Sequence, residues 1–167
     1  TIADKEMPTC TAPSGVTATY GQTLSEITLT NPGGNTAGTW SWMDGTQSVG
    51  NVGEKNFKAK FAPTDTATYQ TVSNIDVTVK VNPKSITPTI ADISDQEYTG
   101  SAITPTVTVT GDGKTLVKDT DYTVEYSNNT NKGTATVTVK AKSGSNYTFS
   151  NVTKNFTIVG KAGKITF

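Results

Sequence analysis

Few side chains in this sequence of 167 residues have the chemistry that catalysis requires. The chain contains no histidine, and Cys10 is its single cysteine. A serine or cysteine nucleophile usually depends on an imidazole base. A reactive thiol at Cys10 would lack that partner, so an incidental cysteine is the simpler interpretation. Nucleophilic catalysis is therefore not expected, and an intrachain disulfide is excluded.

Paired carboxylates are the remaining catalytic possibility, because two such groups can cleave a glycosidic bond. Two close pairs occur, Asp92 with Asp95 and Asp119 with Asp121. Both pairs lie in turn-like runs, where aspartate side chains typically accept hydrogen bonds from nearby backbone amides. We interpret them as turn residues. The sequence thus predicts no catalytic residues and a chain that is not an enzyme.

Metal binding is the next possibility. Asp112, Asp119 and Asp121 could supply oxygen ligands to calcium if their loops met at one end of the fold. Their spacing matches no known calcium-loop pattern. A transition-metal site would need a histidine or a second cysteine. The sequence therefore predicts no metal site and no cofactor.

Trp40 and Trp42 lie on one face of a predicted strand. An exposed aromatic pair can stack on sugar rings, which would make a carbohydrate-binding platform. Alternatively, large aromatic side chains fill the centre of a small sandwich. Tyr122 and Tyr126 occupy the comparable place later in the chain, and this shared spacing favours the core. Ligand-binding residues stay unknown.

Strands are the elements that must position these residues. Apolar and polar residues alternate at 57–61, 77–81, 122–126 and 135–139. A period of two buries one face of a strand and exposes the other. Thr fills about a fifth of all positions, which suits half-exposed strands. Because no window of about 12 residues carries an uninterrupted helical stripe, the fold is predicted to be all-β.

Recurring tyrosines indicate an internal repeat. Tyr20 and Tyr69 are 49 residues apart, as are Tyr98 and Tyr147, and the two pairs are offset by 78. At that offset the run 77–81 aligns with 155–159. Internal repeats of this kind are the signature of tandem modules, here with roughly six to eight short strands each.

The repeat predicts a first module at residues 1–82, with a lead-in at 1–7, and a second module at 83–160. Residues 161–167 are predicted to begin a further repeat or to form a tail, because they echo the opening of the second module. The joint at Pro83 contains no Gly/Ser tract, so it is expected to be a short, stiff hinge.

Two sets of runs carry a family resemblance. The first comprises 38–45, 57–65 and Tyr69, and the second comprises 98–100, 103–107, 119–124, 126–129, 133–137 and 146–147. These sets resemble two sister types of bacterial Ig-like cell-surface repeats, the tandem β-sandwich modules of Gram-positive surface proteins. The resemblance implies two tandem Ig-like β-sandwich modules, secretion, and a spacer or adhesive role.

Some bacterial surface sandwiches carry a Lys–Asn cross-link that a buried acid catalyses, and Lys84, Asn155 and Glu125 are the obvious trio here. Strand alternation opposes this interpretation. Phe156 should face inward, so its neighbour Asn155 should face outward. Tyr126 should also face inward, so its neighbour Glu125 should face outward. A one-residue change of register would reverse that conclusion.

Four Asn-x-Thr triplets lie in the second module, and each is a glycosylation acceptor in a eukaryotic secretory pathway. They begin at Asn128, Asn146, Asn151 and Asn155. In a bacterial protein, abundant Asn and Thr explain them.

The charge pattern restricts the partners. The formal net charge is zero, from 14 Lys against 14 acidic residues, and arginine is absent. A nucleic-acid partner needs a basic patch, and a membrane helix needs about 20 apolar residues. Neither feature is present, so neither partner is expected for this segment.

The first functional hypothesis is therefore a non-catalytic structural spacer on the bacterial cell surface, extracellular, whose partners are neighbouring modules of the same chain. The alternative is an adhesive module that binds glycans or a host surface protein. An adhesive module would need a large exposed apolar or aromatic patch.

Overall fold

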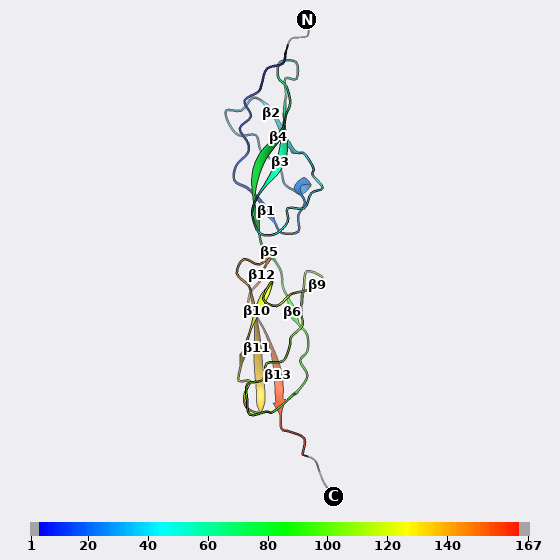
Figure 1. The fold of residues 1–167 in the computed structure, drawn as a ribbon, viewed down its shortest axis with the longest axis vertical. Coiled ribbons are helices and arrows are strands. Elements are labelled where there is room, and N and C mark those ends of the chain that lie inside the picture. Colours follow the sequence, from blue (N-terminus) through cyan, green and yellow to red (C-terminus); the bar gives the residue numbers. More distant parts are fainter. Residues whose placement is uncertain (1–3, 164–167) are drawn as a thin grey trace. The chain divides into compact units, whose positions relative to one another are not determined.

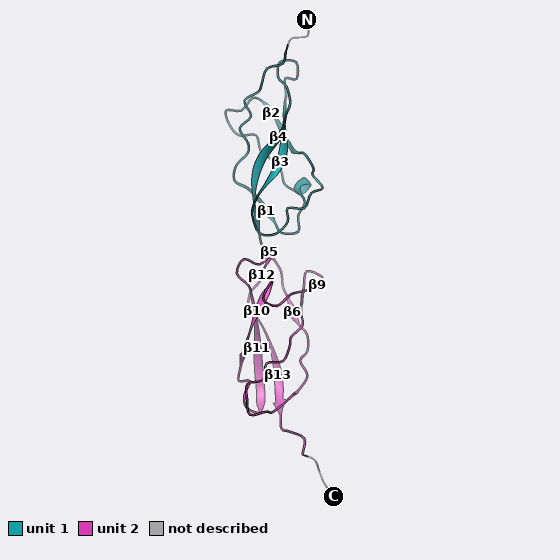
Figure 2. Ribbon diagram, viewed as in Figure 1, with its two compact units in different colours: residues 1–84 teal, residues 85–167 magenta. Residues whose placement is uncertain are grey.

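The computed structural model describes residues 4–163, which fold as β-strands with one short 3₁₀ turn, η1 (Leu24–Glu26). The prediction of an all-β fold is confirmed. The chain divides into two compact units, unit 1 at Thr1–Lys84 and unit 2 at Ser85–Phe167 (Figures 1 and 2). The predicted start of a further repeat at 161–167 falls largely outside the described residues.

Unit 1 contains one four-stranded sheet in the order β1-β4-β3-β2. Its strands are β1 (Val16–Thr19), β2 (Gly38–Trp42), β3 (Gly53–Pro63) and β4 (Val72–Asn82). Neighbouring strands are antiparallel, except that the short β1 runs parallel to β4.

Unit 2 contains a four-stranded sheet in the order β10-β11-β13-β7 and two smaller sheets, β12-β5 and β6-β8-β9. The larger sheet is formed by β7 (Gln96–Glu97), β10 (Tyr122–Ser127), β11 (Gly133–Ala141) and β13 (Val152–Val159). The smaller sheets are formed by β5 (Lys84–Ser85), β6 (Thr89–Ile90), β8 (Val109–Gly111), β9 (Lys114–Thr115) and β12 (Tyr147–Thr148).

The two larger sheets have the same plan, because in each a short strand runs parallel to the last long strand and the other neighbours are antiparallel. Gly53 and Gly133 begin the corresponding strands β3 and β11, with φ of 126° and 125°. Gly53 pairs with Val81, and Gly133 pairs with Ile158. Val81 of β4 therefore corresponds to Ile158 of β13, which is an offset of 77 residues.

The alignment of 77–81 with 155–159 at an offset of 78 is therefore wrong by one residue. Side chains of a strand alternate between faces, so a shift by one residue exchanges the buried and exposed sets. An offset of 78 matches the buried Val79 with the exposed Thr157, whereas the ladder matches Val79 with the buried Phe156.

The offset of 78 does hold where each unit opens. Glu6 forms a parallel bridge with Tyr69, and β5 pairs with β12, which begins at Tyr147. In unit 2 the ladder continues, since Ile86 N–H donates to Thr148 O at 3.0 Å. The corresponding residue in unit 1 is Pro8, which has no N–H, so the ladder there is limited to a single bridge.

Inward side chains of β3 and β4 form the core of unit 1. Seven of them are buried: Phe57, Ala59, Phe61, Pro63, Val77, Val79 and Val81. Leu24 and Val49, which lie outside the strands, cover this face as buried residues. Their segments pair locally, since Leu24 N–H donates to Gln47 O and Val49 N–H to Gln22 O.

Unit 1 thus has four strands among its described residues, fewer than the six to eight expected. Local side-chain hydrogen bonds account for the difference, because they draw the covering segments into turns. Thr23 N–H donates to Glu26 Oε2 at 2.6 Å and starts η1, and Thr46 Oγ1 donates to Asp44 Oδ1 at 2.6 Å.

The core of unit 2 follows the same alternation. Ala135, Val137 and Val139 of β11 and Phe156 and Ile158 of β13 are buried. The other buried apolar residues of this unit come from its smaller strands, its loops and β10: Ile90, Ile103, Val107, Val109, Leu116, Tyr122 and Tyr147. Each unit therefore has its own hydrophobic core.

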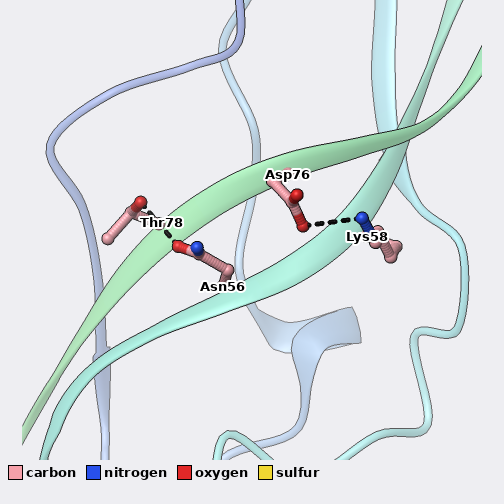
Figure 3. Close-up of polar contacts among 4 residues, drawn as sticks. All are labelled: Asn56, Lys58, Asp76 and Thr78. Atoms are coloured by element: carbon pink, nitrogen blue, oxygen red, sulfur yellow. Dashed lines mark hydrogen bonds and ion pairs between the residues drawn. The ribbon is translucent and has the colours of Figure 1, made fainter.

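The outward face of β3 and β4 is polar (Figure 3). Lys58 Nζ lies 2.9 Å from Asp76 Oδ1, and Thr78 Oγ1 donates to Asn56 Oδ1 at 2.7 Å. Both charged side chains are more than half exposed, at 53% and 56%. An ion pair so exposed contributes no more than about 1 kcal/mol to stability. The buried face therefore dominates the stability of the sheet.

We expect Phe61→Ala to lower the free energy of unfolding of unit 1 by about 3–5 kcal/mol, because it empties a fully buried site. Both tryptophans lie in unit 1, so urea denaturation followed by tryptophan fluorescence reports that unit alone. The matched outward change Thr78→Ala should cost less than about 0.5 kcal/mol. Equal effects of the two substitutions would contradict the assignment of faces.

Candidate functional site

Both tryptophans belong to the core of unit 1. Trp40 is 7% exposed, and its Nε1–H donates to Asn31 Oδ1 at 3.0 Å. Trp42 is half-buried, and its Nε1–H donates to Ile27 O at 2.9 Å. The Trp40 ring also packs 5.3 Å from the Phe61 ring, centroid to centroid. An indole with its face and its N–H engaged inside the unit is not an open platform for a sugar.

The tyrosines at the comparable place in unit 2 are equally engaged. Tyr122 is buried, and the half-buried Tyr126 donates its hydroxyl to Pro105 O at 2.5 Å. Burial raises the pKa of both phenols, and the carboxylates of Asp119 and Asp121 raise that of Tyr122 further. Both rings thus favour the neutral phenol and a structural role.

The Asp119 and Asp121 pair forms a turn. Asp121 Oδ2 accepts the Val117 N–H at 2.8 Å, and Asp119, with φ of 65°, donates its N–H to Tyr122 O. Lys142 Nζ donates to the backbone oxygen of Asp119. The hydrogen bonds of this turn are those expected of aspartates that shape a loop.

The Asp92 and Asp95 pair is exposed. Asp92 Oδ1 lies 2.5 Å from Lys154 Nζ, and this hydrogen-bonded ion pair lowers the pKa of the Asp92 carboxyl. A carboxyl held in its charged form by a lysine on the surface has the opposite tendency to a general acid, whose pKa must be raised.

No cluster of three or more Asp, Glu, Cys or His among residues 4–163 is arranged to hold a metal ion. Asp112, which sequence spacing grouped with Asp119 and Asp121, instead accepts a hydrogen bond of 3.4 Å from the hydroxyl of Tyr147. The three aspartates are not brought together.

Two residues of the candidate cross-link, Glu125 and Asn155, pair with residues outside it. Glu125 Oε2 lies 2.6 Å from Lys140 Nζ, and Asn155 Oδ1 accepts from Thr136 Oγ1 at 3.0 Å. Both residues are exposed, as strand alternation predicted. Lys84 belongs to β5, in a different sheet. The buried acid that such a cross-link requires is not formed by Glu125.

Cys10 is half-buried and packs against the cluster that contains Trp40. It therefore acts as a small apolar residue at the edge of the core. Of the four triplet asparagines, Asn128, Asn151 and Asn155 are exposed and Asn146 is half-buried.

One open surface depression of unit 1 has a volume of about 530 Å³. It is lined by the run 13–17 together with Gln22, Glu26 and Thr28 among others, and it contains no aromatic residue. Ligand pockets are usually apolar with a few polar groups, so this open polar depression has little of that character.

No helix of the described chain is long and apolar enough to cross a membrane.

The feature that sequence reasoning missed is a parallel pair of strands at the sheet edge of each unit. In unit 1 Val16 to Thr19 pair in parallel with Val79 to Asn82. In unit 2 β7 pairs in parallel with the end of β13. The repeated tyrosines mark both sites, since Tyr20 N–H donates to Asn82 O and Tyr98 N–H to Val159 O, each at 2.9 Å. The tyrosine spacing was the available signal.

No family model and no curated protein matches the chain. A solved structure of the fibronectin(III)-like modules of CbhA from Clostridium thermocellum is similar over 93% of this chain and 96% of that chain. Its sequence identity is 12% and its TM-score is 0.31. A likeness at that TM-score assigns neither a fold family nor a function.

We expect the native tryptophan emission to be blue-shifted relative to the unfolded chain and resistant to acrylamide, because both indoles lie in the core. Trp42→Phe leaves only the more deeply buried Trp40, so its emission should be quenched least. Trp40→Phe is the matched variant and should be quenched more readily. If acrylamide quenched the native emission as easily as that of the unfolded chain, the indoles would be exposed. That result would support the carbohydrate-binding interpretation instead.

The stability of the protein should be nearly constant between about pH 5 and 8, because the chain has no histidine. The Thr46 hydroxyl lowers the pKa of Asp44, Thr68 lowers that of Asp65, and Lys154 lowers that of Asp92. A carboxyl whose pKa is lowered by folding stabilises the folded state at pH values above its ordinary pKa of about 3.9. This stability is lost as the pH falls through the pKa of the folded state.

The alkaline limb has the opposite sign. The raised pKa values of Tyr122 and Tyr126 give stability that is complete below about pH 10 and is lost as the pH rises through the folded values. Thermal melts followed by circular dichroism across this range measure both limbs. Tyr126→Phe should weaken the alkaline limb only. A step in the melting temperature near neutral pH would contradict this assignment.

Proposed function

We propose that this chain is a non-catalytic structural spacer of a secreted bacterial cell-surface protein, whose two units hold other domains away from the envelope. The observation that carries the proposal is the parallel pairing of the last long strand with an earlier strand in each unit. The resemblance of the sequence to bacterial Ig-like surface repeats supports the extracellular setting.

Parallel pairing suits a chain under tension. A pull on the ends of unit 1 draws β1 by its N-terminal end and β4 by its C-terminal end. Because the two strands are parallel, these ends point in opposite directions along the ladder. The force therefore shears the hydrogen bonds of β1 and β4 together, whereas an antiparallel pair would open one bond at a time.

The joint between the units supports the same role. β4 ends at Asn82 and β5 begins at Lys84, so Pro83 is the single residue between the two strands. Its ring fixes φ and removes a backbone donor. A joint of one proline has little of the freedom of a Gly/Ser linker, as expected for a spacer that resists collapse.

The distribution of charge on the chain is consistent with a spacer. Lysines and acidic residues are interspersed and sum to zero formal charge. The tryptophans, which were the most promising adhesive residues, are engaged in the core.

Single-molecule pulling on the whole chain tests the proposal. We expect two unfolding events, and a higher unfolding force for unit 1, because four residue pairs form its parallel ladder and two form that of unit 2. The Tyr20 N–H points toward β4, because it donates to Asn82 O. N–H groups two residues apart on a strand point to the same side, so the Ala18 N–H also points toward β4. Ala18→Pro removes that N–H and should lower the unfolding force of unit 1.

Thr17→Pro is the matched control, because the Thr17 N–H points away from β4 and its loss removes no ladder bond. The event of unit 2 serves as an internal control in both variants. Unfolding of both units without measurable resistance, or equal effects of the two proline substitutions, would remove the support for a tension-bearing spacer.

A further inference from the structure

The outer edge of β2 carries a row of backbone groups that no described residue pairs. Met43 N–H donates to Lys58 O, and Thr64 N–H donates to Ala37 O. Ladder bonds of an antiparallel pair alternate along the strand, so Thr39 and Ser41 also face β3. The N–H and C=O groups of Gly38, Trp40 and Trp42 consequently point outward from the sheet.

The opposite edge of the same sheet is capped. The outward N–H of Thr19 on β1 donates to Gln22 Oε1 at 2.8 Å, and its C=O accepts the Gln22 N–H at 3.1 Å. One glutamine thus occupies both outward groups of the residue. Capping of this kind prevents an edge strand from pairing with another chain.

The edges of the larger sheet in unit 2 are also protected. On β10, Tyr122 forms a parallel bridge with Lys118, and its C=O accepts the Asp119 N–H at 2.8 Å. The exposed Glu125 places a charge further along the strand. On the other side β7 is only two residues long and ends at Glu97. Short edges and charges are the usual protection against pairing.

β2 has none of these devices. Its sequence, Gly-Thr-Trp-Ser-Trp, contains no charge and no proline, and its pairing with β3 has no bulge. Its outward side chains, Thr39 and Ser41, are small and exposed. The residue that follows, Met43, is 45% exposed. An edge with these properties lacks the usual protection against pairing with another strand.

We propose that β2 pairs antiparallel with β2 of a second copy of this chain, with Trp40 opposite its symmetry mate. In that register Trp42 of one copy lies opposite Gly38 of the other, and Thr39 lies opposite Ser41. The half-buried indole of Trp42 is thereby set beside a residue without a side chain, and hydroxyls face hydroxyls on the polar face. The strand is therefore complementary to itself in size, and no like charges face each other across the contact.

Self-pairing joins the two four-stranded sheets into one continuous sheet through backbone bonds. Each opposed pair formed by residues 38, 40 and 42 exchanges two hydrogen bonds, as in an antiparallel ladder. Because the contact is isologous, it closes on two copies and forms no fibre. It links neighbouring chains side by side, which goes beyond a spacer that acts alone.

Sedimentation velocity of the unaltered chain, from micromolar to millimolar concentration, should show a reversible monomer–dimer equilibrium. The double substitution Thr39→Lys with Ser41→Lys places two pairs of like charges across the contact. It should raise the dissociation constant roughly tenfold or more. Thr39→Glu with Ser41→Glu should do the same.

A mixture of the lysine and glutamate variants sets opposite charges against each other and should restore a dimer that contains one copy of each. The control is Thr153→Lys with Thr157→Lys, which adds the same charge on exposed positions of β13 and should leave the dimer unchanged. Circular dichroism confirms that each variant is folded.

A monomer at every concentration of the unaltered chain would overturn the proposal. A dimer that survives both double substitutions, or a mixture that fails to associate, would overturn the β2 contact as its basis. Loss of the dimer in the β13 control would indicate association through charge alone and would also overturn it.

Discussion

Burial of a single face on each four-stranded sheet is the constraint on which the rest of this structure depends. Only 33% of the residues are hydrophobic, and the single cysteine provides no intrachain disulfide. Apolar burial is worth roughly 25 cal/mol per Å², so a chain this polar must direct nearly every apolar side chain inward. The long strands β3, β4, β11 and β13 do this by alternation, which is interrupted in β4 between Val72 and Ile75, where the pairing with β3 shifts register. The solvent-exposed faces of the sheets then carry Thr, Lys and Asn, whose interactions with one another are weak.

Alternation is also why the long strands were predictable from sequence. A buried face of period two is a local pattern, and it identified the runs at 57–61, 77–81, 122–126 and 135–139 correctly as strands. Short strands such as β5, β7 and β12 carry no such pattern in two residues. They exist because distant backbone segments meet, which no local window reveals. The one-residue error in aligning the last strands arose likewise, since matching letters do not record which residue each ladder pairs.

The candidate residues divide in the same way. Turn aspartates such as Asp121 could be assigned from sequence because their hydrogen bonds span only a few residues. The engagement of Trp40 by Asn31 joins two segments nine residues apart and depends on how the loop folds back. The parallel strand pairs and the open edge of β2 depend on contacts across the whole unit. The sequence suggested which residues lack catalytic chemistry, but the features that can bear force or bind a partner emerged only with the topology.

The proline at position 8 has a consequence of another kind. Unit 1 opens through one bridge at Glu6, and several side-chain bonds beyond it hold the chain until β1 begins at Val16. Release of this stretch would leave the parallel ladder in place but would uncover one side of the core, because Cys10 and Ala12 pack against the cluster that contains Trp40. A pull on the N-terminal side therefore loads this stretch before it loads β1, and the first interactions to break are those at one edge of the core, not those of the parallel ladder.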